Sequence, residues 1–192
     1  RDLKPGNILV DDSGEVKLLD FGICKLLHNG EASGEETMAG DFPILTPEYA
    51  SPEQVRGEPV TVASDIYSAG AVLYELLSGV KPHQVKEQTL RGLQQAICER
   101  VPPRMSEVAA EAGRVKALRG DLDTIVQTAM QKEPGRRYGS MELFTRDVRR
   151  HLAHEPIEAR PDSLGYRLGK FLRRRRGWVA SAAAVGIAVV LG

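Results

Sequence analysis

Cysteine is scarce in this 192-residue sequence, which contains only Cys24 and Cys98. Two cysteines cannot build a framework of disulfides, and neither has Cys or His neighbours at the spacing of a zinc site. We therefore expect both to be small thiols that are buried or half-buried. About 150 residues already bury roughly 70% of the surface that an unfolded chain exposes, so a core of this size needs no disulfide or metal.

The sequence also lacks a net charge, because 26 Lys and Arg residues balance 26 Asp and Glu residues. It has no internal repeat and no low-complexity stretch. With 42% hydrophobic and 27% charged residues, this composition excludes a disordered tail, a collagen-like fibre and a uniformly basic nucleic-acid binder. The composition is that of a globular domain without a nucleic-acid partner.

The neutrality is an average over two unlike parts of the chain. Residues 160–192 carry seven basic side chains and one acid, so residues 1–159 are acidic. The basic side chains end in the run Arg173–Arg176, and the following stretch, Trp178–Leu191, carries no charge. This apolar stretch is shorter than the roughly 20 residues that a spanning helix needs. Because it stops at the chain end and the first residue is not Met, we expect both ends to be truncations.

The basic and apolar tail predicts a location at the cell membrane. Basic residues concentrate on the cytoplasmic side of spanning helices, and each is attracted to an anionic leaflet. We expect residues 155–176 to be a basic juxtamembrane segment that contacts lipids. Residues 177–192 would then begin the transmembrane helix of a single-pass protein whose residues 1–154 lie in the cytoplasm. A buried helix of a soluble domain is the alternative, but four consecutive arginines are hard to place in a core.

The hydrophobic patterns predict an α+β fold that is mainly helical with one small hairpin. Two short aliphatic runs, residues 8–10 and 16–19, flank a turn and indicate the hairpin. Residues 62–77 are apolar nearly all round, which predicts a helix in the middle of the core. An amphipathic helix is expected from Asp121 to before Pro134, and another from the N-cap Ser140.

The polar residues that could take part in catalysis or metal binding lie on both sides of the predicted hairpin. Residues 1–7, Arg-Asp-Leu-Lys-Pro-Gly-Asn, place a carboxylate, an ammonium and a carboxamide just before it, and Asp20-Phe21-Gly22 adds a carboxylate just after it. A hairpin can bring its two ends together. Carboxylate and carboxamide oxygens suit a hard cation such as Mg²⁺, which takes one or two protein carboxylates and leaves room for substrate phosphates.

These motifs resemble those of protein kinases. The first seven residues, followed thirteen residues after Asn7 by Asp-Phe-Gly, resemble the catalytic loop and the metal-binding motif of that family. Residues 46–53 resemble its substrate-facing loop and Ala-Pro-Glu motif, with Ser51 in place of Ala. Residues 64–70 resemble the start of the family's buried central helix, and residues 133–138 resemble its late Asp-Pro-x-x-Arg motif. Four motifs in the family's order are a specific signal.

The resemblance implies roles for the residues around the hairpin. Asp2 would accept or orient the proton of the attacking hydroxyl, and Lys4 would contact the γ-phosphate and the substrate. Asn7 and Asp20 would hold two Mg²⁺ ions, with Mn²⁺ as an alternative, that bridge the phosphates of ATP. Leu9 would form the floor beneath the adenine, although the residues alone are equally typical of an ordinary core leucine.

The resemblance also implies supports for the site. Glu53 and Arg137 would form a buried bidentate ion pair that anchors the activation segment. Asp65 would accept hydrogen bonds from the backbone of the catalytic loop near Arg1.

An arginine before the catalytic aspartate marks kinases whose activation loop is ordered by phosphorylation, because a phosphate can pair with that arginine. Ser33 and Thr37 are the candidate acceptors in this loop, and Thr46 belongs to the substrate-facing part. Phosphorylation of one copy by another implies a homodimer.

Taken together, the order of kinase motifs, basic segment and apolar run resembles bacterial receptor-type serine/threonine kinases of the eukaryotic-like group. Residues 1–154 would be the C-terminal lobe of the kinase domain, and Lys4 is typical of Ser/Thr rather than Tyr specificity. The Gly-rich loop, the strand-three lysine and the N-lobe glutamate are not in the sequence. We therefore expect the isolated chain to bind ATP poorly and to transfer nothing, whereas the parent protein would phosphorylate protein substrates.

Two other functions remain open on the sequence. A pseudokinase scaffold is the first, because the ATP-binding lysine is not seen. A small-molecule phosphotransferase of related fold is the second, but residues 46–53 argue against it because a small substrate needs no peptide-presenting loop.

Overall fold

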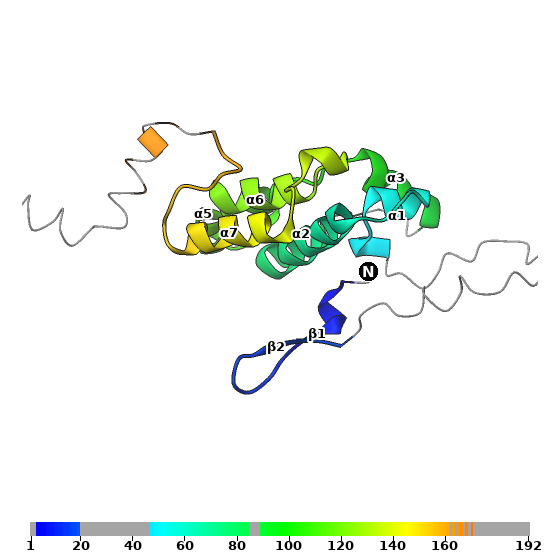
Figure 1. Ribbon diagram of the computed structural model, residues 1–192, viewed down its shortest axis with the longest axis horizontal. Helices are drawn as coiled ribbons and strands as arrows, with labels where there is room; N and C mark the ends of the chain where they lie inside the picture. The colour runs from blue at the N-terminus through cyan, green and yellow to red at the C-terminus, as the bar shows by residue number, and fades with distance from the viewer. Residues whose placement is uncertain are drawn as a thin grey trace, which may run out of the picture.

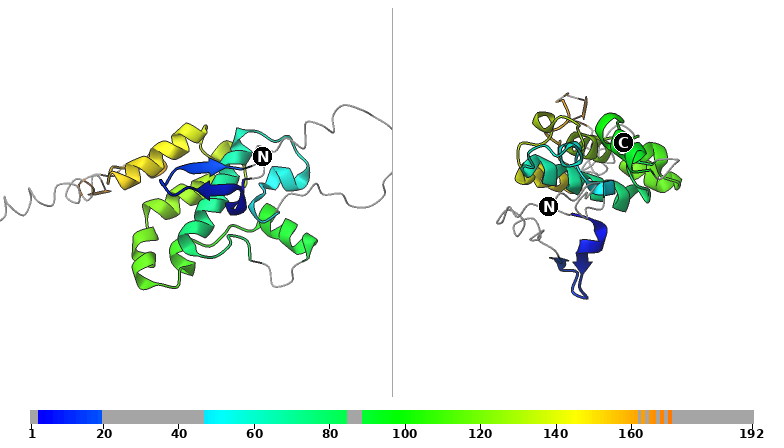
Figure 2. Two further views of the ribbon diagram at one scale, coloured as in Figure 1. Left: turned by 90° about the horizontal axis from the view of Figure 1, so that it is seen from below. Right: turned by 90° about the vertical axis from the view of Figure 1, so that its right-hand side faces the viewer.

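The computed structural model describes residues 3–19, 47–84 and 89–161, together with residues 163, 165, 166, 168 and 170. Within these residues the chain forms a helical body from which a two-stranded hairpin projects (Figure 1). The mainly helical organisation with one hairpin is therefore confirmed. Figure 2 shows the hairpin on one side of the body, which is otherwise built only of helices and loops.

The hairpin consists of β1 (Ile8–Val10) and β2 (Val16–Leu18), which pair antiparallel with Ile8 opposite Leu18. A 3-10 turn, η1 (Pro5–Asn7), precedes it. The connecting turn is held by the Asp11 carboxylate, which accepts hydrogen bonds from the backbone N–H groups of Ser13 and Glu15, both at 3.0 Å. The hairpin predicted from the two aliphatic runs is present.

Helix α2 (Val62–Ser78) is the centre of the body, as its apolar sequence predicts. It begins at the N-cap Thr61 and ends at Gly79, whose φ of +81° is the left-handed value that glycine adopts without strain. It packs against α4 (Met105–Val108), α6 (Asp121–Ala129) and α7 (Met141–Leu152). Its two sides contribute Tyr67 and Ile66, both fully buried, to two adjacent core clusters.

The other two predicted helices are also present. Helix α6 begins at Asp121 as expected and ends at Ala129, and α7 follows the N-cap Ser140, whose Oγ accepts a hydrogen bond from the N–H of Leu143 at 3.2 Å. Sequence reasoning missed the other elements, most of which are stretches of a few residues that show too little periodicity. These are η3 (Pro47–Tyr49), α1 (Pro52–Arg56), α3 (Leu90–Glu99), α4, α5 (Ala112–Leu118) and η4 (Pro134–Arg136).

The packed body continues past residue 154, where we expected the lobe to end. Ile157 is 3% exposed and belongs to the core cluster of Ile66 and Phe144. A single apolar residue after a helix carries no periodic signal, so the sequence could not reveal this contact.

Within the described residues, no helix combines the length and the hydropathy that a bilayer crossing requires. The predicted span, residues 177–192, lies outside them, as does the arginine run before it. Of the two cysteines, Cys98 is half-buried and free, and Cys24 lies outside the described residues.

Candidate active site

The turn η1 presents Lys4 and Asn7 at the base of the hairpin. Lys4 is its N-cap, and its carbonyl oxygen accepts a hydrogen bond from the N–H of Asn7 at 3.0 Å. Pro5 at the first position has the fixed φ that suits a tight turn. Both Lys4 and Asn7 are half-buried, so they lie at the boundary between the body and the hairpin.

The hairpin brings its two ends together at Asn7. The N–H of Leu19 donates a hydrogen bond to the carbonyl oxygen of Asn7 at 2.9 Å, which extends the ladder by one residue beyond the paired strands. The residue that immediately precedes Asp20 is therefore held beside Asn7. The hairpin therefore brings together Asn7 and Leu19, the residues at its two ends.

Several predicted site residues lie outside the described residues, so their roles stay predictions. These are Arg1, Asp2, Asp20, Ser33, Thr37 and Thr46. In the part of the chain that the structure does describe, no three His, Cys, Asp or Glu side chains are grouped as metal ligands. Asp65 is half-buried in the first turn of α2, and the backbone near Arg1 that it was expected to bind is likewise not described.

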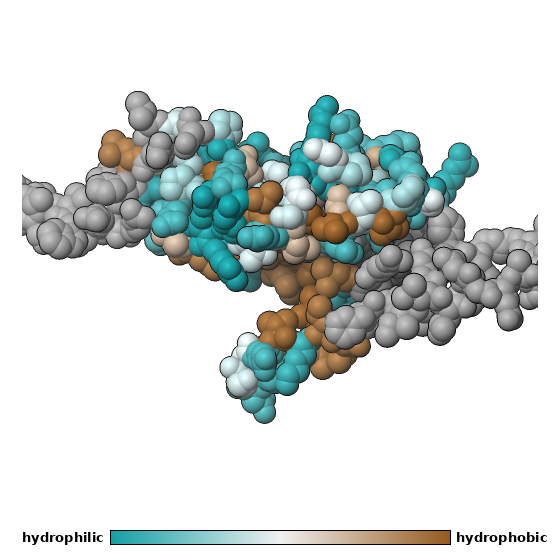
Figure 3. All heavy atoms as spheres, viewed as in Figure 1, coloured by the Kyte–Doolittle hydropathy of each residue, from teal (hydrophilic) through white to brown (hydrophobic). Residues whose placement is uncertain are grey.

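Leu9 is not a core leucine, because half of its surface is exposed. Leu9 stands opposite Lys17 in the ladder, whereas Val10, Val16 and Leu18, which are also exposed, share the other face of the hairpin with Ile8. Figure 3 shows hydrophobic residues along the base of the hairpin and hydrophilic ones at its tip. Residues Leu3 and Ile8 anchor the hairpin by packing against the core cluster around α2. Apolar side chains therefore lie next to Asn7.

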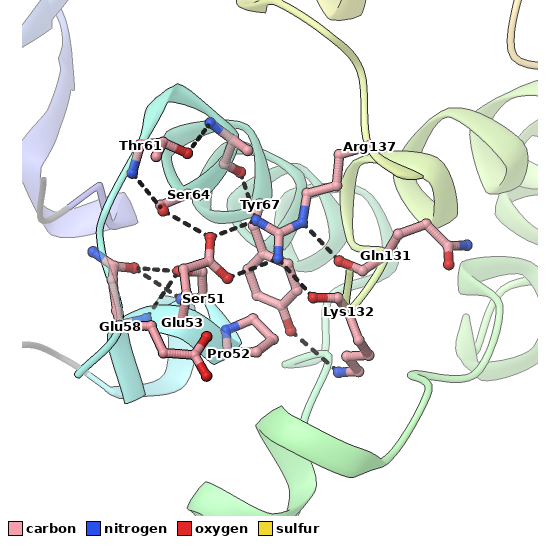
Figure 4. A network of polar contacts seen from close by, with 12 residues as sticks. Ser51, Pro52, Glu53, Glu58, Thr61, Ser64, Tyr67, Gln131, Lys132 and Arg137 are labelled. Carbon is pink, nitrogen blue, oxygen red and sulfur yellow. Dashed lines mark hydrogen bonds and ion pairs between the residues drawn. The ribbon is translucent and has the colours of Figure 1, made fainter. Parts of the chain in front are cut away.

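The ion pair of Glu53 and Arg137, predicted from the kinase resemblance, is present and buried (Figure 4). The two Nη atoms of Arg137 donate to the two carboxylate oxygens of Glu53 at 2.6 and 2.8 Å. The side chains are 0% and 4% exposed. The pair joins α1 to the loop after η4 across 84 residues of sequence.

Arg137 uses all five of its N–H groups. In addition to Glu53, it donates to the carbonyl oxygens of Ala63, Gln131 and Lys132 at 2.7, 2.7 and 3.0 Å. Because arginine has five donors in a fixed fork, no other side chain could satisfy this set of acceptors. Its guanidinium also lies 5.0 Å from the centre of the Tyr67 ring. Arg137 therefore ties α1, the start of α2 and the end of α6 together.

The Glu53 carboxylate remains charged in this buried position. Burial by itself raises the pKa of Glu53, but the hydrogen bonds from Arg137 and from Ser64 Oγ, at 2.7 Å, outweigh it and lower the pKa to about 2. The local backbone supports this arrangement, since Ser51 caps α1 in a capping box with Gln54.

This lowered pKa predicts an acid-sensitive fold. A group whose pKa falls from 4.5 in the unfolded chain to about 2 stabilises the folded state above pH 4.5 and loses that contribution as the pH falls towards 2. We expect the free energy of unfolding, measured by urea denaturation, to decrease over this interval. In a carbon-13 NMR titration the Glu53 carboxyl should titrate near pH 2; titration near pH 4.5 would contradict the prediction.

A second group of buried side chains surrounds Tyr67, and sequence reasoning missed it. The hydroxyl of Tyr67 lies 2.8 Å from Nε2 of His83, and Lys132 donates to the carbonyl oxygen of Ile97 at 2.7 Å. Burial lowers the pKa of Lys132 to about 8, and burial together with that lysine lowers the pKa of His83 to about 3. His83 is therefore neutral at pH 7 and acts as a hydrogen-bond partner.

The segment before α1 is attached to α2 and to the loop that follows α2 by two further contacts. The hydroxyl of Tyr49 donates to Glu75 at 2.5 Å, and Lys81 pairs with Glu48 at 2.7 Å. These partners are 26 and 33 residues apart, so no local pattern could have predicted them. Residues 47–53 therefore have a fixed shape on the surface of the body.

Comparison with known proteins agrees with this architecture. The profile of the protein kinase domain matches residues 1–148. A probable serine/threonine-protein kinase of Corynebacterium efficiens is 37% identical over 169 residues, which are 84% of this chain and 24% of that protein. The serine/threonine-protein kinase PknB of Mycobacterium tuberculosis is 36% identical over 159 residues, 83% of this chain and 24% of that protein.

A probable serine/threonine-protein kinase PknB of Bifidobacterium longum is 36% identical over 148 residues, 77% of this chain and 20% of that protein. The chain thus spans about a quarter of the length of the curated relatives that it matches. The matched region includes the hairpin, the Glu53–Arg137 pair and the central helix α2. The chain belongs to the protein kinase family.

Proposed function

We propose that this chain is the C-terminal lobe of a serine/threonine protein kinase, which transfers the γ-phosphoryl group of ATP to Ser and Thr hydroxyls of proteins. The observation that carries the proposal is the hydrogen bond between Leu19 and Asn7, because it holds the residue before the Asp-Phe-Gly motif beside Asn7. Family membership and the names of the relatives support the same activity.

The nucleotide would bind at the base of the hairpin. The oxygens of Asn7 and Asp20 are ligands that Mg²⁺ or Mn²⁺ accepts, and the half-buried carboxamide of Asn7 lies next to the chain that leads to Asp20. Bound divalent ions would neutralise charge on the phosphates. The exposed side chain of Leu9 offers an apolar floor to the adenine.

The remaining groups would act on the substrate. Asp2 orients and accepts the proton of the attacking hydroxyl, and the Lys4 ammonium attracts the transferred phosphate. Residues 47–53 present the peptide, and their attachment through Tyr49, Glu48 and Glu53 supports a surface of constant shape. Such a surface favours a protein kinase over a small-molecule phosphotransferase.

The basic tail would place the kinase at the cytoplasmic face of the cell membrane. Residues 171–176 add four basic charges, all from consecutive arginines, and no acid to the segment before the apolar run. Contact with anionic lipids follows from this charge. Phosphorylation of Ser33 or Thr37 by a second copy, as a homodimer, would order the activation loop.

The test is phosphorylation of a general protein substrate by the full-length protein with Mg²⁺-ATP. We expect transfer to Ser and Thr residues, a loss of roughly 10²- to 10⁴-fold in the Asp2→Asn variant, and no change in the matched Asp12→Asn variant, whose carboxylate is in the exposed hairpin turn. No transfer, with the Asp2→Asn variant identical to the wild type, would favour the pseudokinase scaffold.

A further inference from the structure

The chain that follows α7 is fastened to the lobe by two buried carboxylates. The first is Asp147 of α7, which is 1% exposed. Its oxygens accept hydrogen bonds from the N–H groups of Glu158 and Ala159 at 2.7 and 2.9 Å and from the hydroxyl of Tyr138 at 3.1 Å. The chain therefore turns back against α7 directly after that helix ends.

The second carboxylate is Asp121, the first residue of α6, which is 6% exposed. It accepts a hydrogen bond from the hydroxyl of Tyr166 at 3.1 Å and pairs with Arg160 at 3.4 Å and with the ammonium of Lys170. His151 of α7 lies 3.7 Å away. The side chain of Lys170 is only 12% exposed, so it is withdrawn from the solvent.

The groups around Asp121 also contact one another. The Tyr166 ring lies between two cations, with the Arg160 guanidinium 4.6 Å and the Lys170 ammonium 5.8 Å from its centre. The same tyrosine hydroxyl accepts a hydrogen bond from the N–H of Ile157 at 3.0 Å. Displacement of one group would therefore disturb the others.

Electrostatic interactions favour the placement of cationic side chains around the Asp121 carboxylate. Burial raises the pKa of Asp121, but the neighbouring groups of His151, Lys170 and Tyr166 lower it well below its usual range, so the carboxylate is charged. The N-terminus of α6 adds a positive potential that also favours an anion. A charged carboxylate inside the body retains its cationic partners more strongly than a solvated surface would.

We propose that Asp121, Arg160, Tyr166 and Lys170 form a clamp, the Asp121 clamp, that docks the basic segment permanently on the α6–α7 end of the lobe. The inference rests on the proposed membrane contact of Arg173–Arg176. Arg173 is the third residue after Lys170, and three residues span at most about 11 Å. The α6–α7 end of the lobe therefore faces the lipid, with Lys170 held by protein and the arginines left for anionic headgroups.

Hydrogen exchange of the full-length protein tests the clamp. We expect the amides of residues 157–170 to be protected in solution. The Lys170→Met variant, which keeps the apolar stem, should exchange at least about tenfold faster there. Lys116→Met is the matched control, since Lys116 is an exposed lysine of α5, and it should leave this protection unchanged.

The same measurement on vesicles tests the orientation. On phosphatidylcholine vesicles that contain phosphatidylserine, we expect the wild-type protein to bind and residues 157–170 to stay protected. Three outcomes would overturn the clamp. Residues 157–170 could lose protection on the vesicles, they could exchange rapidly in solution, or their exchange could be the same in the Lys170→Met variant as in the wild type. Failure to bind the vesicles, with protection intact in solution, would instead overturn the membrane part of the proposed function and the orientation drawn from it.

Discussion

Replacing Arg137 by alanine is expected to lower the free energy of unfolding by about 3–5 kcal/mol. The change leaves the buried carboxylate of Glu53 without its bidentate partner and removes the donors to the carbonyl oxygens of Ala63, Gln131 and Lys132. The cost arises because a buried charge and buried acceptors keep their desolvation penalty when the partner is lost. Urea denaturation of the full-length protein measures it.

The neighbouring residue provides the control. Arg136 also pairs with a glutamate, Glu133, at 2.7 Å, but these side chains are 69% and 67% exposed. An exposed pair contributes about 0–1 kcal/mol, so Arg136→Ala should have little effect. Equal effects of the two alanine variants would show that burial of the Glu53 pair is not what stabilises the fold. A double variant, Glu53→Met with Arg137→Met, removes both charges of the buried pair. It should recover only part of the stability lost in Arg137→Ala, since the carbonyl oxygens of Ala63, Gln131 and Lys132 stay unpaired.

Replacing Gly70 by alanine should destabilise the protein by about 1–2 kcal/mol, although the same change normally stabilises a helix. In α2, a Cβ at position 70 would lie 2.9 Å from Cβ of Ala129 and 3.0 Å from Cγ of Met130. Overpacking of a buried contact costs about 1–3 kcal/mol, and the gain in helix propensity offsets at most about 1 kcal/mol. Thermal or urea unfolding gives the sign of the difference.

A second glycine inside a helix is the matched comparison. Gly113 in α5 is exposed and has no heavy atom within 4 Å of an added Cβ, so Gly113→Ala should stabilise by about 0.5–1 kcal/mol. The double variant Gly70→Ala with Ala129→Gly should recover part of the loss, because it removes the closest of the two contacts. A Gly70→Ala protein as stable as the wild type would mean that α2 and α6 can move apart without cost.

Gly70 and Arg137 both affect the arrangement of the helices around the site. The close approach of α2 and α6 at Gly70 sets the distance between the helices, and Arg137 then bridges α1, α2 and the end of α6. The short helix α1 has only five residues and would not be stable alone. We therefore expect both substitutions to affect the shape of the segment 47–53 as well as global stability.

The elements that the sequence predicted correctly are those with long or strongly patterned signals. Helix α2 shows an apolar run that ends at Gly79, and α7 shows a polar N-cap before its apolar stripe. The hairpin shows two aliphatic runs with a turn between them. Helices α4 and α5 were missed because they are short, whereas α3, with ten residues, was missed although it is longer than α6.

The motifs around the hairpin were interpreted through the resemblance of their order and spacing to those of protein kinases, and the roles of their residues stay predictions. The local pattern did not identify which distant side chains pair. The pairing of Glu53 with Arg137 came only from the family resemblance, because 84 residues separate the two side chains. The contact of Tyr49 with Glu75 had no signal of either kind.

The sequence by itself determined the hairpin, the central helix and the chemical character of the motifs, because each depends on residues that are close together in the chain. Only the tertiary structure decided which buried charges meet. Lys170 appeared in the sequence as one basic residue of a tail, and the fold places it against Asp121, 49 residues earlier. Burial makes such a pairing strong, and burial is a property of the packed molecule and not of any local segment.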